Sequence, residues 1–94
     1  MPLSFEWDES KAVSNQLRHG VSFEEAASIF RDSMSVTIYD PDHSSSTEDR
    51  FITIGLSARH RILIAVHCDR GNRIRIISAR LATRRERNQY EQST

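Results

Sequence analysis

The sequence predicts a single α+β domain, residues 1–94, in which an antiparallel β-sheet packs against two N-terminal helices and a short basic helix follows at the C-terminal end. Length is one reason, because 94 residues suffice for one hydrophobic core and no more. Apolar residues also recur with helical spacing in the first third of the chain and in runs rich in Ile and Val afterwards. The connections between these runs are short enough to join only antiparallel neighbours.

The N-terminal third predicts one strand and two helices. Residues 3–7 alternate apolar and polar side chains, as in a short strand. Asp8 offers a side-chain N-cap for a helix, and Gly20 is a natural stop for it. A second helix, residues 22–31, opens on a Ser-x-x-Glu capping box, and its apolar residues fall at i, i+3, i+4 and i+7. That stripe predicts a helix that faces the core.

The remainder predicts most of the sheet and one last helix. Residues 34–39 alternate again, and residues 40–49 read as a mobile acidic loop. Thr83 and Glu86 form a second capping box, which opens a short basic helix through about Tyr90. Three runs rich in Ile and Val lie between the loop and this helix, at residues 51–56, 62–68 and 73–79.

Composition excludes several classes of protein. No stretch approaches the roughly 18–20 apolar residues that span a bilayer, so no membrane association is expected. Acidic residues at the N-terminus do not fit a signal peptide, and the single cysteine, Cys68, excludes an internal disulfide. These features predict a cytoplasmic protein.

The residues for metal or cofactor chemistry are sparse. No two of the four histidines stand at the i, i+4 spacing typical of zinc ligands, and there is no second cysteine. The three glycines are far apart, so no glycine-rich phosphate loop is present. We therefore expect neither a metal ion nor a cofactor.

The net charge of zero conceals a split along the chain. Residues 1–49 carry three cations and ten acids, a net of −7, whereas residues 50–94 carry ten cations and three acids, a net of +7. Twelve of the thirteen cations are arginines, and the planar guanidinium binds phosphate through two hydrogen bonds. Codon bias is an alternative explanation for the excess of Arg over Lys, but it does not explain the clustering.

Arginines on the run 73–79 leave two interpretations open. Arg73 and Arg75 share one face of a regular strand, whereas Arg80 points to the other, so Arg75 and Arg80 serve one site only if the strand ends or bulges between them. One interpretation is an ion pair with an N-terminal acid. The other is an anion-binding sheet face that the last helix extends through Arg84, Arg85 and Arg87.

The chemical needs of RNA cleavage without a metal are modest. A base removes the proton of the 2′-hydroxyl, an acid protonates the leaving oxygen, and cations stabilise the charged transition state. His67 and His19 are candidates because imidazole titrates near neutral pH, although His19 also fits a capping or packing role. If His67 pairs opposite Ile74 it faces away from Arg75, and a one-residue slip brings the two to the same face.

Two blocks of the sequence resemble a known family. The first block is Phe5-Glu6-Trp7-Asp8-x-x-Lys11-x-x-x-Asn15 followed by Arg18-His19-Gly20-Val21-Ser22-Phe23-x-x-Ala26. The second is Arg50-Phe51 to Gly55, then Ile74-Arg75-Ile76-Ile77-Ser78-Ala79-Arg80 and Ala82-Thr83-x-x-Glu86-x-x-x-Tyr90. Both resemble the BrnT family of toxins, in the expected order and over nearly the whole chain. The resemblance implies a RelE-like fold and a ribonuclease that stops translation.

The same resemblance implies partners and site residues. A type II toxin–antitoxin operon implies neutralisation by a BrnA-type antitoxin, and operator DNA is then contacted only through the antitoxin's DNA-binding domain. The positions that match the family pattern and can touch phosphate are Lys11, His19, Arg50, Arg75 and Arg80.

The leading hypothesis is a metal-independent endoribonuclease that inhibits translation. Arg75 and Arg80 would stabilise the scissile phosphate with Arg50 nearby, and His67 or His19 would transfer protons. The expected RNA-binding residues are Lys11, Arg73, Arg84, Arg85 and Arg87. The alternative is a non-catalytic module that binds nucleic acid or forms an autoregulatory complex, although the sequence contains no helix-turn-helix or RNP-like aromatic pair.

Overall fold

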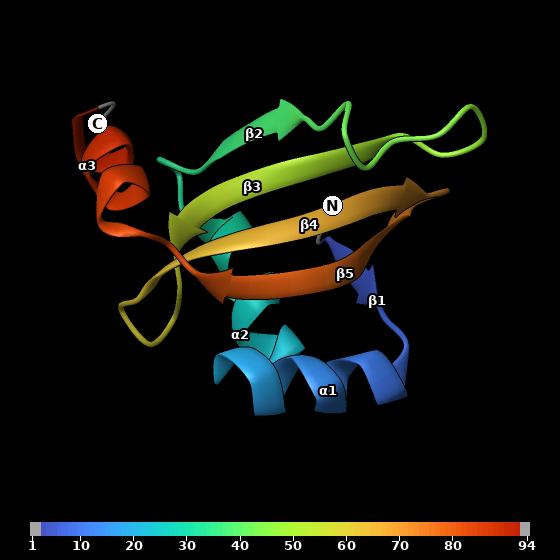
Figure 1. Cartoon of the computed structure of the whole chain (residues 1–94), viewed down its shortest axis with the longest axis horizontal. Coiled ribbons are helices and arrows are strands. Elements are labelled where there is room, and N and C mark those ends of the chain that lie inside the picture. The colour runs from blue at the N-terminus through green and yellow to red at the C-terminus, as the bar shows by residue number, and fades with distance from the viewer. Residues whose placement is uncertain (1–2, 93–94) are drawn as a thin grey trace.

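The computed structural model describes residues 3–92 and confirms the α+β class (Figure 1). None of the helices within those residues combines the length and apolar character that a membrane crossing requires. The elements in chain order are β1 (Ser4–Glu6), α1 (Glu9–His19), α2 (Phe23–Ser28), the 3₁₀ turn η1 (Ile29–Arg31), β2 (Val36–Tyr39), β3 (Arg50–Leu56), β4 (Ile62–Arg70), β5 (Arg73–Leu81) and α3 (Arg84–Gln92).

The capping residues read from the sequence begin and end the helices. Asp8 accepts a hydrogen bond from the Lys11 backbone N–H at 3.0 Å, and Gly20 ends α1 in the left-handed conformation with φ 68°. Ser22 caps α2 in the same way as Asp8 caps α1. Thr83 and Glu86 satisfy each other's backbone N–H groups at 3.2 and 2.8 Å, which is a complete capping box at the start of α3.

The five strands form one sheet in the order β1-β5-β4-β3-β2. Strands β3, β4 and β5 are antiparallel neighbours, as their short connections predict, and β2 is antiparallel to β3. Strand β1 is the exception, because it pairs with β5 in parallel, with Phe5 opposite Ile74. Two helices, three strands and their loops separate β1 from β5 along the chain, so no short connection dictates their relative direction.

Strand β5 contains a bulge. Val66 and His67 are consecutive on β4, but their partners on β5 are Ser78 and Ile76, so Ile77 is an extra residue. The bulge reverses the alternation of side chains on β5 between its two halves. It fulfils the condition under which Arg75 and Arg80 share a face.

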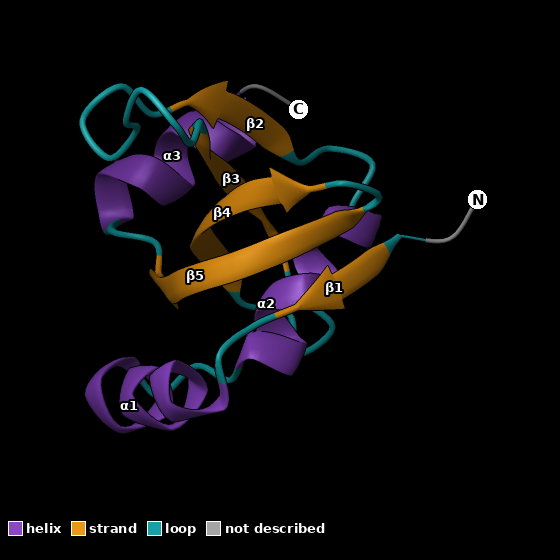
Figure 2. Ribbon diagram, turned by 90° about the vertical axis from the view of Figure 1, so that its right-hand side faces the viewer, coloured by secondary structure: helices purple, strands orange, loops and turns teal. Residues whose placement is uncertain are grey.

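Helix α2 packs against one face of the sheet, α1 lies along the β5 edge, and α3 lies on the other side (Figures 1 and 2). Gly55 lets η1 approach β3 closely, since a Cβ there would lie 3.0 Å from the Ile29 carbonyl oxygen. The buried core lies between the sheet and the two N-terminal helices, and it consists of Val21, Phe23, Ala26, Ile29, Leu63, Ala65, Ile76 and Ala79.

Asn15 joins α1 to β5. Its side-chain amide accepts from the Ala79 N–H at 3.0 Å and donates to the Ala79 carbonyl at 2.8 Å and to the Val21 carbonyl at 3.0 Å. Strand β1 covers this edge of β5 only as far as Arg75, so the amide supplies the hydrogen bonds that a longer β1 would make.

We expect Asn15→Ala to lower the free energy of unfolding by about 2–4 kcal/mol, because buried backbone groups lose their partners. Chemical denaturation measures this, with Ser14→Ala, an exposed position on the same helix, as the control. Equal stabilities of the two variants would show that water replaces the amide without cost.

Candidate functional site

On the sheet face opposite α2, a row of four residues crosses four strands, and three of the four are charged. Arg50 on β3 lies opposite Cys68 on β4, Cys68 lies opposite Arg75 on β5, and Arg75 lies opposite Glu6 on β1. Arg75 forms an ion pair with Glu6 at 2.9 Å, and Arg50 forms one with Glu48 at 3.0 Å. Arg73 approaches Glu6 more loosely, at 3.9 Å.

This row borders a small basic cavity of about 160 Å³. The start of α1 contributes Lys11 and the acidic N-cap beside it, and the strands contribute Arg50, Arg70 and Arg75. The structure therefore brings together three residues that the sequence analysis selected, Lys11, Arg50 and Arg75, and adds Arg70. Arg75 is paired with an N-terminal acid, as the first interpretation predicts, and it also lines this cavity.

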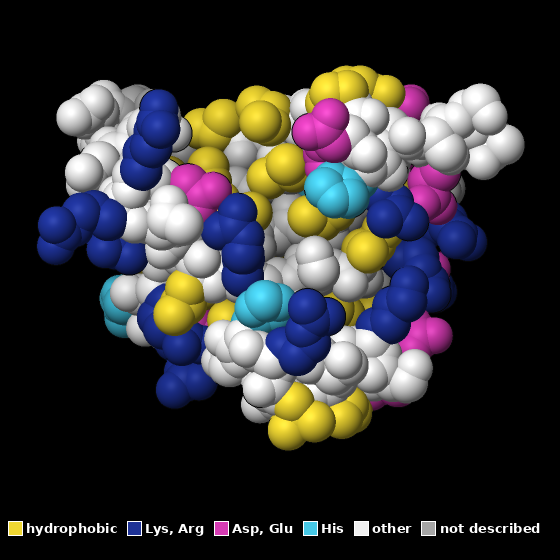
Figure 3. Space-filling model, viewed as in Figure 1, with side chains coloured by type: hydrophobic (Ala, Val, Ile, Leu, Met, Phe, Trp, Pro, Cys, Tyr) yellow, Lys and Arg dark blue, Asp and Glu magenta, His cyan; other side chains and the backbone are white. Residues whose placement is uncertain are grey.

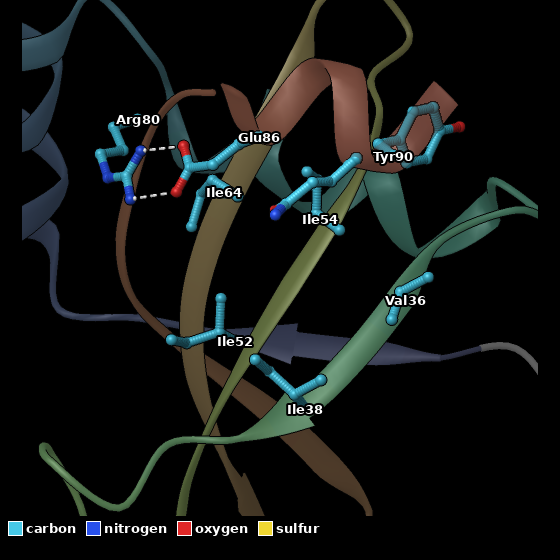
Figure 4. Close-up of a pocket in the computed structure, with 9 residues that line it drawn as sticks. Val36, Ile38, Ile52, Ile54, Ile64, Arg80, Glu86 and Tyr90 are labelled. Atoms are coloured by element: carbon cyan, nitrogen blue, oxygen red, sulfur yellow. Dashed lines mark hydrogen bonds and ion pairs between the residues drawn. The ribbon is translucent and has the colours of Figure 1, made fainter. Parts of the chain in front are cut away.

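Arg80 lies at the other end of the same face. Its guanidinium makes two hydrogen bonds to the Glu86 carboxylate, at 2.8 and 3.0 Å (Figure 4). The paired guanidinium holds the pKa of Glu86 down at about 2, and the carboxylate in turn raises the pKa of Arg80. Arg80 is thus fixed against α3 by the same glutamate that completes the capping box of that helix.

The two predicted phosphate ligands share the face but stand well apart. Arg80 pairs with Ile64 and Arg75 with Cys68, and these two β4 residues lie on one side of a regular strand. Four residues of strand separate them, which is about 13 Å. The face therefore offers two cationic ends, with Ser78 between them on β5, instead of one cluster.

Figure 3 shows Lys and Arg side chains gathered at these two ends, over α3 and over the opposite ends of β4 and β5, with hydrophobic side chains between them along β2 and β3. Arg84, Arg85 and Arg87 on α3 are exposed. They extend the Arg80 end of the face. Arg87 also donates to the Ala82 carbonyl at 3.1 Å, which ties α3 to the end of β5.

His67 lies on the covered face of the sheet. It pairs with Ile76 across the bulge, so it points into the core, away from Arg75. Its Nε2 is 2.7 Å from the Thr53 hydroxyl, and its ring packs between Phe30 and Phe51. Burial lowers the pKa of His67 and favours the neutral imidazole. The structure does not bring His67 and Arg75 together.

His19 ends α1 and is exposed. The next residue, Gly20, accepts a hydrogen bond from Arg61 at 3.0 Å, and Ala82 beyond β5 bonds to Ile62. Helix α1 thus begins beside the basic cavity and ends at the Arg80 end of the sheet. Within residues 3–92, no hydrogen bond or ion pair fixes the His19 ring.

The structure adds a candidate that the sequence alone does not indicate, a histidine bound to an aspartate. His43 Nδ1 lies 2.5 Å from Oδ2 of Asp40, and Asp40 is buried. The Asp40 backbone N–H donates to the Arg50 carbonyl at 2.9 Å, so the pair stands at the β3 end of the charged row. The Asp-x-x-His spacing is visible in the sequence, but it lies in a segment that was predicted to be a mobile loop.

Comparison with known proteins places the chain in a family. Residues 7–86 match the family model described as the ribonuclease toxin BrnT of type II toxin–antitoxin systems. The chain belongs to the BrnT family. It also matches the 1.1 Å crystal structure of the Brucella abortus ribonuclease toxin BrnT, with 22% identity and a TM-score of 0.63 over 88% of this chain and all of that one. No curated protein matches it.

Family membership accounts for the resemblance of both sequence blocks, and the likeness to the Brucella structure confirms the fold. Among residues 3–92, no three His, Cys, Asp or Glu side chains lie close enough together to hold a metal ion. The cationic face is thus the feature of this BrnT-family chain that calls for a chemical role.

We expect the Glu86 carboxyl to titrate at about pH 2 in the folded protein, far below its usual 4.5. A carboxyl whose pKa is lowered by folding stabilises the folded protein at pH values above its usual pKa. This contribution is lost as the pH falls from about 4.5 toward 2. Carbon NMR of the carboxyl measures the midpoint. Arg80→Met should raise it toward the usual value and Arg59→Ala should not, whereas an ordinary midpoint in the unmodified protein would contradict the bidentate pair.

Proposed function

We propose that this BrnT-family chain is a metal-independent endoribonuclease that inhibits translation and is neutralised by a BrnA-like antitoxin. The observation that carries the proposal is the bulge at Ile77, which turns Arg75 and Arg80 to one accessible sheet face. In the proposed complex the toxin contacts operator DNA only through the antitoxin.

The RNA strand runs along β5 between the two cationic ends. Arg75, with Lys11 and Arg50 around the small cavity, binds one phosphate, and Arg80 binds another about 13 Å away along the strand. A carboxylate orients each guanidinium through part of its N–H groups, and the phosphate binds to the N–H groups that remain. Cations fixed in this way stabilise the charge that develops on the phosphate being cleaved.

We assign proton transfer to His43. The buried Asp40 orients its Nδ1 and leaves Nε2 of this exposed side chain available, close in the chain to the point where the Asp40 backbone bonds to Arg50. A carboxylate that fixes one ring nitrogen and leaves the other exposed is the usual arrangement for a histidine that acts as general base or acid. His67 has the wrong orientation for this task, and His19 has no carboxylate that orients it among the interactions of residues 3–92.

We expect the purified protein to cleave RNA in the presence of EDTA, and Arg75→Ala and Arg80→Ala each to slow cleavage by at least about tenfold. Labelled RNA resolved on gels gives the rates, and Arg59→Ala, a change of an exposed loop arginine, is the matched control. Cleavage that stops in EDTA and returns with a divalent ion would overturn metal independence. Salt-dependent binding without products would favour the non-catalytic alternative.

We expect His43→Asn to slow cleavage by at least about tenfold and to remove a limb of the pH–rate profile. His60→Asn is the matched control, since His60 has φ 63° and Asn tolerates that conformation. Asp40→Asn should reduce the rate while keeping an imidazole-dependent limb. If His43→Asn keeps the full rate and profile, proton transfer belongs to another group.

A further inference from the structure

An apolar groove separates α3 from the sheet. Its volume is about 290 Å³, and aliphatic side chains from three strands point into it (Figure 4). The floor consists of Val36, Ile38, Ile52, Ile54 and Ile64, and the remaining lining comes from Arg80 at the end of β5 and from Glu86, Gln89 and Tyr90 on α3.

Side chains in this groove remain in contact with solvent. Ile38 is 57% exposed and Val36 is 40% exposed. Helix α3 is held at its start by the Arg80–Glu86 pair and at its far end by a hydrogen bond from the Tyr90 hydroxyl to Asp32. The helix is thus fixed at both ends without filling the space between itself and β2. A contiguous aliphatic surface of this kind usually marks a binding site.

Strand β2 forms one side of the groove and is the edge of the sheet. Asp40, just after β2, donates its backbone N–H to Arg50 on β3. Backbone groups of an antiparallel strand alternate between its two sides, so those of Thr37 and Tyr39 point away from the sheet. All four residues of β2 are exposed, and the edge is accessible to another strand.

We propose that the groove and the β2 edge bind an extended segment of the antitoxin that has aliphatic side chains on one face and acidic residues beside α3. The inference rests on the proposed function for the existence of this partner. Backbone hydrogen bonds to Thr37 and Tyr39 supply affinity, and aliphatic side chains that enter the groove supply specificity. Arg84 and Arg85 on α3, which are exposed, attract the acidic residues.

The chemistry of the groove favours a protein over the other occupants. Nucleobases stack on aromatic rings, and the floor is aliphatic, with Tyr90 at one end. A second copy joined edge to edge would offer β2 itself, and Val36–Tyr39 contains no acidic side chain to meet the cations of α3. A segment of another chain with aliphatic and acidic side chains matches both the aliphatic floor of the groove and the cations of α3.

Overlapping peptides that tile the BrnA-like antitoxin of the proposed function serve as the probe, and their binding to the whole toxin is followed by fluorescence anisotropy. We expect Ile38→Asp to weaken the tightest peptide by at least about tenfold, which corresponds to about 1.4 kcal/mol. Leu17→Asp, at an 83% exposed aliphatic position on α1, is the matched control and should change binding less than twofold. Thermal melts establish that both variants are folded.

Amide hydrogen exchange tests the edge without any substitution. The Thr37 and Tyr39 amides should exchange rapidly in the free toxin and become protected when the peptide binds. Unchanged exchange at both amides, or full peptide affinity in Ile38→Asp, would overturn the proposal.

Two further readouts identify the other occupants and separate this proposal from the proposed function. A free toxin that is dimeric and becomes monomeric in Ile38→Asp would assign the groove to a second copy, and loss of RNA binding with intact peptide binding would assign it to RNA. Peptide binding is measured without reference to cleavage. A toxin that binds the peptide but cleaves no RNA would therefore refute the proposed activity and leave the docking site standing.

Discussion

The extra residue Ile77 in β5 allows Ile76 and Ala79 both to point into the core while Arg75 and Arg80 both point away from it. In a regular strand these requirements conflict, since residues five apart lie on opposite faces. One guanidinium would then enter the core without a partner, at a cost that a small domain cannot absorb. The two hydrogen bonds between the Asn15 amide and the Ala79 backbone, one in each direction, hold the strand just beyond the bulge and fix its new alternation.

Only some of the charged residues in the acidic half of the chain form ion pairs with arginines of the basic half. Glu6 and Glu48 come from the acidic half and pair with arginines at one end of the open face, whereas Arg80 finds Glu86 within its own half. Carboxylates therefore hold the guanidinium groups of both ends in position. Arg84 and Arg85 keep exposed positions on α3, so part of the positive charge of the second half lies at the surface around that helix.

The elements of this fold could be predicted from sequence because their causes are local. Asp8, Ser22 and Thr83 cap helices through bonds to residues three positions away, and short connections impose antiparallel pairing. The parallel direction of β1 depends on partners 69 positions away on β5, and the bulge depends on which β4 residues pair with β5 across the hairpin; periodicity encodes neither. Whether His67 shares a face with Arg75 could not be predicted either, because the extra residue Ile77 on β5 decides on which face Arg75 lies.

Helix α3 links the two uses of the open face. Glu86 caps the helix and holds Arg80, and both residues also line the aliphatic groove. The proposed segment in the groove would contact both the helix and the sheet. It would therefore restrict the movement of Arg80 even where it does not touch the guanidinium. The proposed substrate site and the proposed partner site thus adjoin each other on one surface. In the proposed complex, the antitoxin segment therefore combines acidic residues that meet the cations of α3 with aliphatic side chains that RNA does not have.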